Sequence, residues 1–220
     1  MSPELTQPLP DEARLALAYT PEFLRGPLRI FFEFDARLAR LVTATSEPML
    51  GQVRLAWWRD TLGMAVSERP KGDEVLDAIG QHWAGAEEAL VALVNGWENM
   101  LAEPPMSEEA VLAFADGRGQ ALAGLNFFGG GGEKIANMLS EAGRLWALAD
   151  AASHLPQGEE RDTFVSLGRS IAPIAALKVP YKGVSVLAAL AARSLRVGGK
   201  PLMAGRGAAL VALRAGILGR

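Results

Sequence analysis

Residues 28–62 read LRIFFEFDARLARLVTATSEPMLGQVRLAWWRDTL, two apolar segments joined by a short polar stretch. In the first segment the apolar side chains recur at intervals of three and four residues, which is the spacing of one face of an α-helix. The members of this stripe are Leu28, Phe31, Leu38 and Val42, and Asp35 stands at the position that completes it. Because the joining stretch is short, the pattern predicts two antiparallel helices, at 25–43 and 47–66.

The rest of the chain continues the helical pattern. Alanine and leucine dominate, β-branched runs are rare, and glycine and proline fall at helical intervals, so we predict an all-α fold. With 220 residues, half of them apolar, the chain is expected to form a single domain, 1–220, with a flexible N-terminal segment at 1–13. The other helices are predicted at 11–18, 73–102, 107–127, 133–154, 161–178, 182–196 and 204–218.

Composition excludes several classes of chemistry. The chain has no cysteine, which rules out disulfides and thiolate metal sites and suits a reducing cytoplasm. No apolar run approaches the roughly 18 to 20 residues that cross a bilayer, so we expect no membrane span. No dinucleotide fingerprint, zinc-protease motif or catalytic triad is recognisable.

Asp35 is expected to point inward, and a buried carboxylate needs a counter-charge or hydrogen-bond donors. The second predicted helix offers Arg54 and Arg59 as partners for Asp35 or for a bound anion. We expect Trp57 to pack in the core and Trp58 to lie at the mouth of a cavity. The alternative is that both rings are ordinary packing and that both arginines extend to solvent.

Asp150 and His154 form a second candidate pair. Their spacing of four residues places them on one face of the predicted helix 133–154, where they could share a metal ion or a proton. His154 also precedes a proline near the expected helix end, so capping of the helix C-terminus is the simpler interpretation.

The charge of the chain is unevenly distributed. Residues 1–160 hold 12 Lys and Arg against 24 Asp and Glu, whereas residues 161–220 hold 10 Lys and Arg against one acid, Asp162. This basic segment is expected to attract an anion, and residues 193–220 are expected to contact a membrane surface peripherally. A basic solvated face, or a helix pair that completes the bundle, would explain the same pattern. Nucleic acid is not expected, because no aromatic residue follows Tyr181 among the basic residues.

The motif at 28–62 resembles the N-terminal helical hairpin of the squalene/phytoene synthase family, especially its short bacterial members and the related respiratory complex I assembly factors. The resemblance implies an all-α isoprenoid synthase fold with a central cavity, in which aspartate-rich motifs bind Mg²⁺ and isoprenoid diphosphates. It would make Asp35 and Asp150 metal ligands, and it adds Arg54, Trp58, Arg59, His154 and Lys178 as candidate ligand- or diphosphate-binding residues. An isoprenoid- or lipid-like ligand, a respiratory-complex partner and a place at the inner membrane are implied in the same way.

The sequence departs from the chemistry of that family. Ala39 stands where the first motif has its second carboxylate, and His154 stands where the second motif ends in aspartate. Mg²⁺ prefers oxygen donors, and clamping a diphosphate takes several carboxylates. We therefore expect a degenerate relative that binds a ligand or assists assembly, with an active prenyl transferase as the alternative.

Overall fold

The computed structural model describes residues 8–45, 47–171 and 181–218. The described residues are helical with no strand, which confirms the all-α prediction. The α-helices are α1 (Asp11–Ala18), α2 (Glu22–Thr43), α3 (Pro48–Gly63), α4 (Glu74–His82), α5 (Glu87–Glu98), α6 (Glu108–Ala123), α7 (Leu125–Gly129), α8 (Glu133–His154), α9 (Glu159–Ile171), α10 (Lys182–Arg196) and α11 (Arg206–Leu218), and a 3₁₀ turn, η1, covers Asn99–Leu101.

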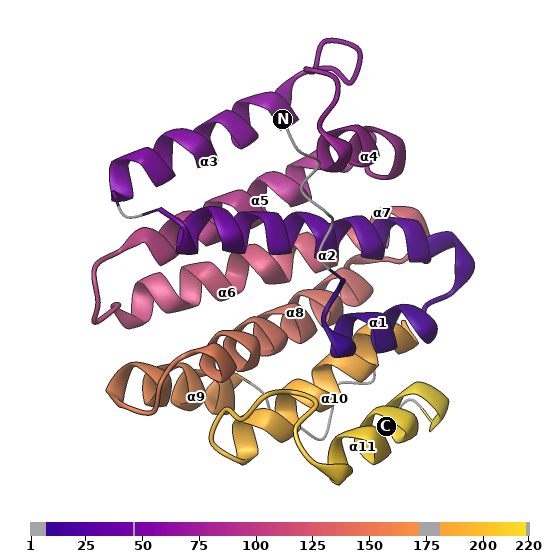
Figure 1. Cartoon of the computed structure of the whole chain (residues 1–220). Coiled ribbons are helices and arrows are strands. Elements are labelled where there is room, and N and C mark those ends of the chain that lie inside the picture. Colours follow the sequence, from indigo (N-terminus) through magenta and orange to yellow (C-terminus); the bar gives the residue numbers. More distant parts are fainter. Residues whose placement is uncertain (1–7, 46, 172–180, 219–220) are drawn as a thin grey trace.

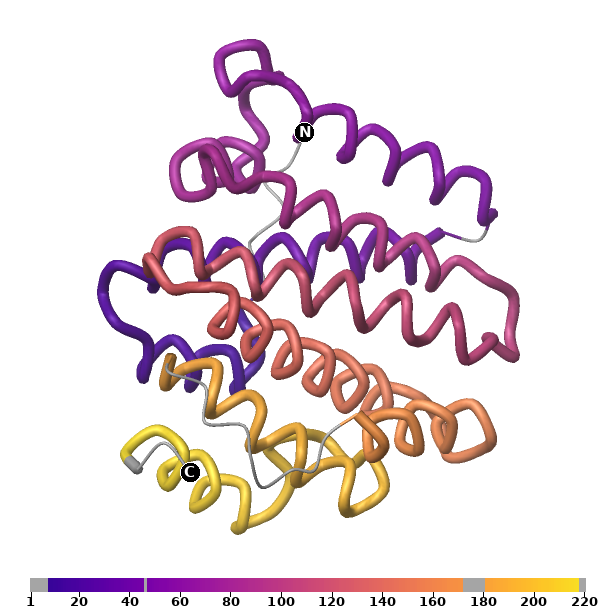
Figure 2. Tube along the Cα trace, turned by 180° about the vertical axis from the view of Figure 1, so that it is seen from behind, coloured from indigo at the N-terminus to yellow at the C-terminus, as the bar shows by residue number. Residues whose placement is uncertain are grey.

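The helices stack in an order that differs partly from their order in the chain (Figure 1). Seen from behind, the stack runs α3, α5, α6, α8, α10 and α11 from one end of the molecule to the other (Figure 2). Helix α2 crosses the front of this stack and contacts α4, α5, α6 and α7. The predicted hairpin of α2 and α3 is present, but α3 packs mainly on α5. Because α3 packs on α5, α2 is free to cross the middle helices of the stack.

Close approach of α5, α6 and α8 depends on facing glycines. A Cβ atom at Gly117 would lie 2.6 Å from the Cα atom of Gly96 on α5 and 2.5 Å from the carbonyl oxygen of Ala92. On the other side of α6, a Cβ atom at Gly143 of α8 would lie 2.8 Å from the Cα atom of Gly119. These distances are shorter than any normal contact, so the three helix backbones meet only because the side chains are absent. We call these four glycines, Gly96, Gly117, Gly119 and Gly143, the glycine seam.

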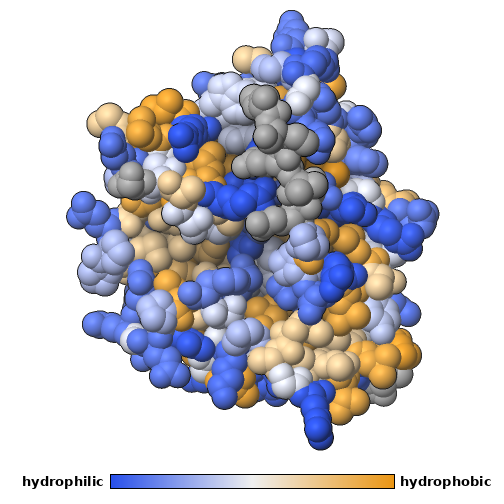
Figure 3. Space-filling model, in the orientation of Figure 1, coloured by the Kyte–Doolittle hydropathy of each residue, from blue (hydrophilic) through white to orange (hydrophobic). Residues whose placement is uncertain are grey.

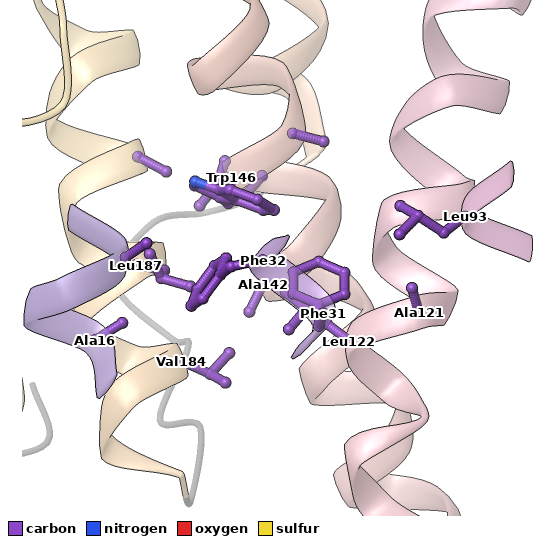
Figure 4. Close-up of a cluster of buried hydrophobic side chains, with 14 of the residues drawn as sticks. Ala16, Phe31, Phe32, Leu93, Ala121, Leu122, Ala142, Trp146, Val184 and Leu187 are labelled. Carbon is purple, nitrogen blue, oxygen red and sulfur yellow. The ribbon is translucent and has the colours of Figure 1, made fainter. Parts of the chain in front are cut away.

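An aromatic cluster fills the core beside the seam (Figure 4). Phe31 and Phe32 of α2 lie with ring centroids 5.8 and 5.7 Å from the Trp146 ring of α8, in tilted and edge-on arrangements. Leu187 of α10 and Leu93 of α5 flank the cluster on either side. The cluster therefore joins the front helix to both halves of the stack.

Several helix boundaries in the structure differ from the predicted ones. The segment 73–102 is not one helix, because the chain turns between α4 and α5, where Gly85 takes a positive φ of 85°. Helix α1 begins at Asp11, inside the segment 1–13 that we expected to be flexible, and residues 1–7 lie outside the described residues. Helix α9 ends at Ile171, and the remainder of the predicted helix 161–178 lies outside the described residues.

Among the described residues, none of the helices has both the length and the apolar character needed to cross a membrane.

Candidate functional site

Arg118 of α6 is the centre of the most heavily charged buried site that the structure describes. The residue is 2% exposed, and its guanidinium joins two carboxylates that come from different helices. Its Nε donates to Asp35 Oδ1 at 2.9 Å, and its Nη2 donates to Asp35 Oδ2. Its Nη1 donates to Asp150 Oδ2 at 2.9 Å. The planar guanidinium thus binds Asp35 of α2 through two bonds and Asp150 of α8 through one.

Aromatic rings enclose this guanidinium. Its Cζ atom lies 3.9 Å from the centroid of the Trp146 ring and 5.3 Å from the centroids of Trp97 and Phe114. Cations are attracted to aromatic faces, and more strongly where water is excluded. Trp97 also donates its Nε1 hydrogen to Asp35 Oδ1 at 2.8 Å. The charged groups of Arg118 and Asp35 are therefore held by ion pairing, ring faces and a direct hydrogen bond together.

The backbone of α6 places the arginine within reach of both acids. Arg118 lies between Gly117 and Gly119, which bring α5 and α8 against the backbone of α6 on its two sides. The approach of α8 through Gly119 is what allows one guanidinium to reach Asp150, while α2 presents Asp35 from the front of the stack. We call Asp35, Arg118 and Asp150 the ion triad.

The ion triad carries one positive and two negative charges. Burial lowers the pKa of Arg118, but the charges of Asp35 and Asp150 and their hydrogen bonds outweigh it, so the pKa is raised above its ordinary value. The pKa of the Asp35 carboxyl is also raised, because burial outweighs Arg118 and Trp97, which act in the opposite direction. Arg118 stays protonated.

The Asp150 end of the ion triad is the more open end. The Asp150 side chain is 16% exposed, against 8% for Asp35. On the face that shows α1, α2 and α8, hydrophilic side chains gather around a hollow between the levels of α2 and α8 (Figure 3). Glu12 of α1 lies at this end: burial raises the pKa of its carboxyl, and the charge of Asp150 raises it further. A third acid thus lies near the Asp150 end of the ion triad.

Replacing Glu12 with glutamine should make stability less dependent on pH. Because the pKa of Glu12 is raised in the folded chain, the folded state binds more protons than the unfolded state, and ionisation costs stability as the pH rises above the ordinary range of a carboxyl group. Urea unfolding at about pH 4 should give similar free energies for Glu12→Gln and the wild type, whereas at about pH 7 the variant should be the more stable. A difference that stays constant with pH would contradict this interpretation.

The structure brings together only some of the residues expected from the sequence. Asp35 is buried, and it meets Asp150 through the shared Arg118. The expectation that Arg54 or Arg59 would serve Asp35 is wrong: Arg54 is exposed on α3, and Arg59 pairs with Glu98 of α5. Both arginines lie on α3, which packs mainly on α5. Lys178 lies outside the described residues.

His154 lies at the end of α8 with its side chain 77% exposed. Its Nδ1 is 2.8 Å from the carbonyl oxygen of Asp150, one turn earlier, and 3.8 Å from Asp150 Oδ1. A histidine that donates to the last carbonyl groups of a helix is a C-terminal cap. The geometry agrees with the capping interpretation.

The prediction for the two tryptophans of α3 is wrong, because the buried ring is Trp58 and the exposed ring is Trp57. Trp58 is 4% exposed and packs on Phe34, with ring centroids 4.9 Å apart, whereas Trp57 is 43% exposed. The buried stripe of α3 is Gly51, Leu55, Trp58 and Leu62. Gly51 belongs to it because Leu101 occupies the space of a side chain there. The outer stripe of α3 consists of Met49, Leu50, Val53, Trp57 and Met64, all at least 43% exposed.

The ion triad does not suit Mg²⁺. A magnesium ion takes six oxygen donors at about 2.0–2.1 Å and is usually held through carboxylates. Here both Asp35 oxygens and one Asp150 oxygen accept hydrogen bonds from Arg118, which lies where a cation bridging the two acids would lie. No group of three or more His, Cys, Asp or Glu side chains able to hold a metal occurs in the described part of the chain.

In comparisons with known proteins, no family model matches the chain, and no curated protein or solved structure is significantly similar to it. The resemblance to squalene/phytoene synthases therefore rests on the motif at 28–62 and on the helix order expected from the sequence.

Arg118 is the residue of the site that the sequence analysis missed. It stands in the stretch DGRGQ, residues 116–120. The two glycines that flank Arg118 could have identified it. The segment otherwise favours a helix, and glycine in the middle of a helix costs about 1 kcal/mol relative to alanine, so its presence indicates close packing at that point.

Proposed function

We propose that the chain is a non-catalytic binding or assembly protein of the squalene/phytoene synthase type. The observation that carries this proposal is the position of Arg118 between Asp35 and Asp150. These are the two carboxylates that the resemblance assigns to metal binding. A guanidinium between them supplies the neutralising charge that metal ions supply in active members of that family.

Prenyl transfer would require this arrangement to be undone. A departing diphosphate needs positive charge placed where its negative charge develops. Arg118 is turned inward, with its charge balanced by two carboxylates and its plane against Trp146. Freeing it would leave buried acids without a counter-charge, which costs several kcal/mol. The geometry therefore favours a structural use of Asp35 and Asp150 over diphosphate chemistry.

Exposed apolar surface supports a role in binding. The outer stripe of α3 presents five large apolar side chains to solvent, and patches of that kind mark contacts with other molecules. Such a surface suits the assembly role, with a respiratory complex as the partner that the resemblance suggests. An isoprenoid- or lipid-like ligand remains part of the proposal, and it rests on the resemblance alone.

The test is diphosphate release. The purified chain is incubated with farnesyl diphosphate or geranylgeranyl diphosphate and MgCl₂, beside an active squalene synthase as the positive control. We expect no release above the protein-free blank. We also expect farnesol, which lacks the diphosphate, to raise the melting temperature equally with MgCl₂ and with EDTA. Release that requires Mg²⁺ and disappears in Asp35→Asn would instead establish the alternative, an active prenyl transferase.

A further inference from the structure

The outer face of α11 carries large aliphatic side chains where a surface helix normally presents polar ones. Leu210, Leu213 and Ile217 are 68%, 48% and 58% exposed. The face that packs inward is built from small residues, Ala208, Ala212 and Ala215, all at most 1% exposed. Amphipathic helices of globular proteins turn their larger apolar side chains to the core. The reversed arrangement of α11 indicates a second apolar environment outside the molecule.

The charge around these side chains is positive. Arg206 and Arg214 are exposed on α11, and Arg196 and Lys200 are exposed just before it. Successive residues of a helix are about 100° apart, so Arg206 and Arg214 fall on the same side of α11 as the three aliphatic residues. The sequence has no acidic residue after Asp162. The surface therefore complements an apolar layer bordered by negative charge.

The position of α11 leaves this face accessible. The helix lies at one end of the stack, at the edge of the molecule (Figures 1 and 2). It packs against α10, and Gly216 lies close to the Tyr19 ring at the end of α1. Because its long axis runs along the surface, the helix can lie flat on a plane that touches the end of the molecule.

We infer that α11 is a peripheral docking face for an anionic lipid bilayer. Leu210, Leu213 and Ile217 enter the boundary between headgroups and acyl chains, and Arg206 and Arg214 extend to lipid phosphates. Arginine side chains suit this position, because their aliphatic stems cover apolar surface while the charged ends stay in the headgroup layer. This inference does not depend on the proposed function.

The surrounding charge distinguishes the outer face of α11 from the outer stripe of α3, which is also apolar and exposed. The outer stripe of α3 lies at the opposite end of the stack, beside two exposed acids, Glu47 and Asp60, and one exposed base, Arg54, so its surroundings carry net negative charge. An anionic surface repels these acids, so the α3 stripe provides a matched control. It is comparably apolar but is not expected to bind anionic lipid.

The experiment is co-sedimentation of the full chain with phosphatidylcholine vesicles that contain or lack phosphatidylglycerol. We expect binding to the anionic vesicles that weakens as salt is added, since each basic residue near such a surface contributes about fivefold. Leu210→Ser/Leu213→Ser/Ile217→Ser should lower the partition coefficient about tenfold or more. Leu50→Ser/Val53→Ser/Trp57→Ser, on α3, should leave it unchanged. Circular dichroism verifies that both variants remain helical.

Three outcomes would overturn the inference. One is equal recovery of the wild type in the supernatant with every vesicle. A second is loss of binding in the α3 variant with retention in the α11 variant, which would move the docking face to α3. A third is a wild-type dimer in light scattering that the α11 substitutions convert to a monomer, with no vesicle binding, which would make a second copy of the chain the occupant.

Discussion

Replacing Arg118 with methionine should lower the free energy of unfolding by about 3–5 kcal/mol. The substitution keeps a long apolar stem but leaves Asp35 and Asp150 buried together without a cation. It also removes the charge that lies against the Trp146 ring. Urea unfolding followed by circular dichroism at about pH 7 measures the loss, because both carboxylates are then ionised in the unfolded state.

Two further variants test whether this loss of stability comes from the ion triad. Arg54→Met removes an exposed arginine and should change stability by no more than about 0.5 kcal/mol. The triple variant Asp35→Asn/Arg118→Met/Asp150→Asn removes all three charges and should recover part of the stability lost in Arg118→Met. A loss in Arg118→Met no larger than in Arg54→Met would show that the triad is not a buried ionic unit.

The second large effect is expected in the glycine seam. Gly117→Ala places a Cβ atom 2.5 Å from the Ala92 carbonyl oxygen and 2.6 Å from the Gly96 Cα atom, and backbone atoms cannot swing aside as a side chain can. Overpacking costs about 1–3 kcal/mol and sometimes more, and it exceeds here the gain in helix propensity of about 1 kcal/mol. Because the obstacle is backbone, we expect a cost at the upper end of this range and a net loss of about 2 kcal/mol in urea unfolding.

Gly63 at the end of α3 supplies the matched control. It is exposed, and a Cβ atom built on it meets nothing within 4 Å. Gly63→Ala should therefore be neutral or stabilising by up to about 1 kcal/mol, through the lower entropy of the unfolded chain. If Gly117→Ala behaved like Gly63→Ala, the close contact of α5 and α6 would not be a feature of the folded chain.

The fold class followed from the sequence because apolar periodicity and breaker spacing are local properties. The inward direction of Asp35 followed for the same reason, since the stripe that contains it is regular. The partner of Asp35 did not follow. Arg118 lies 83 residues away in the sequence. The apolar pattern of its helix does not indicate which other helix it packs against. Pairing between distant helices is decided by how their backbones pack, here through the glycine seam, and no short segment encodes it.

The error at the two tryptophans has a different physical origin. Helix α3 is apolar on two sides, so periodicity alone offers two stripes and does not say which is buried. The stripe with Leu50, Val53 and Trp57 has the larger apolar side chains, which favours the prediction that Trp57 faces the core. The buried one includes Gly51, whose place is filled by Leu101. A glycine contributes nothing to a hydrophobic stripe, although it can mark the side on which a neighbour comes closest.

The ion triad also has a consequence for synthesis of the chain. Asp35 belongs to α2, yet its counter-charge, Arg118, comes 83 residues later, and Arg118 meets its second acid after 32 more. Until α6 is complete, α2 presents an apolar stripe interrupted by an uncompensated carboxylate, and docking that stripe is unfavourable. A nascent chain that ends before Arg118 therefore has no stable packing position for α2. The packing of α2 depends on translation through α6, so the interval before α6 emerges is the period in which this helix is most exposed to aggregation and to chaperones.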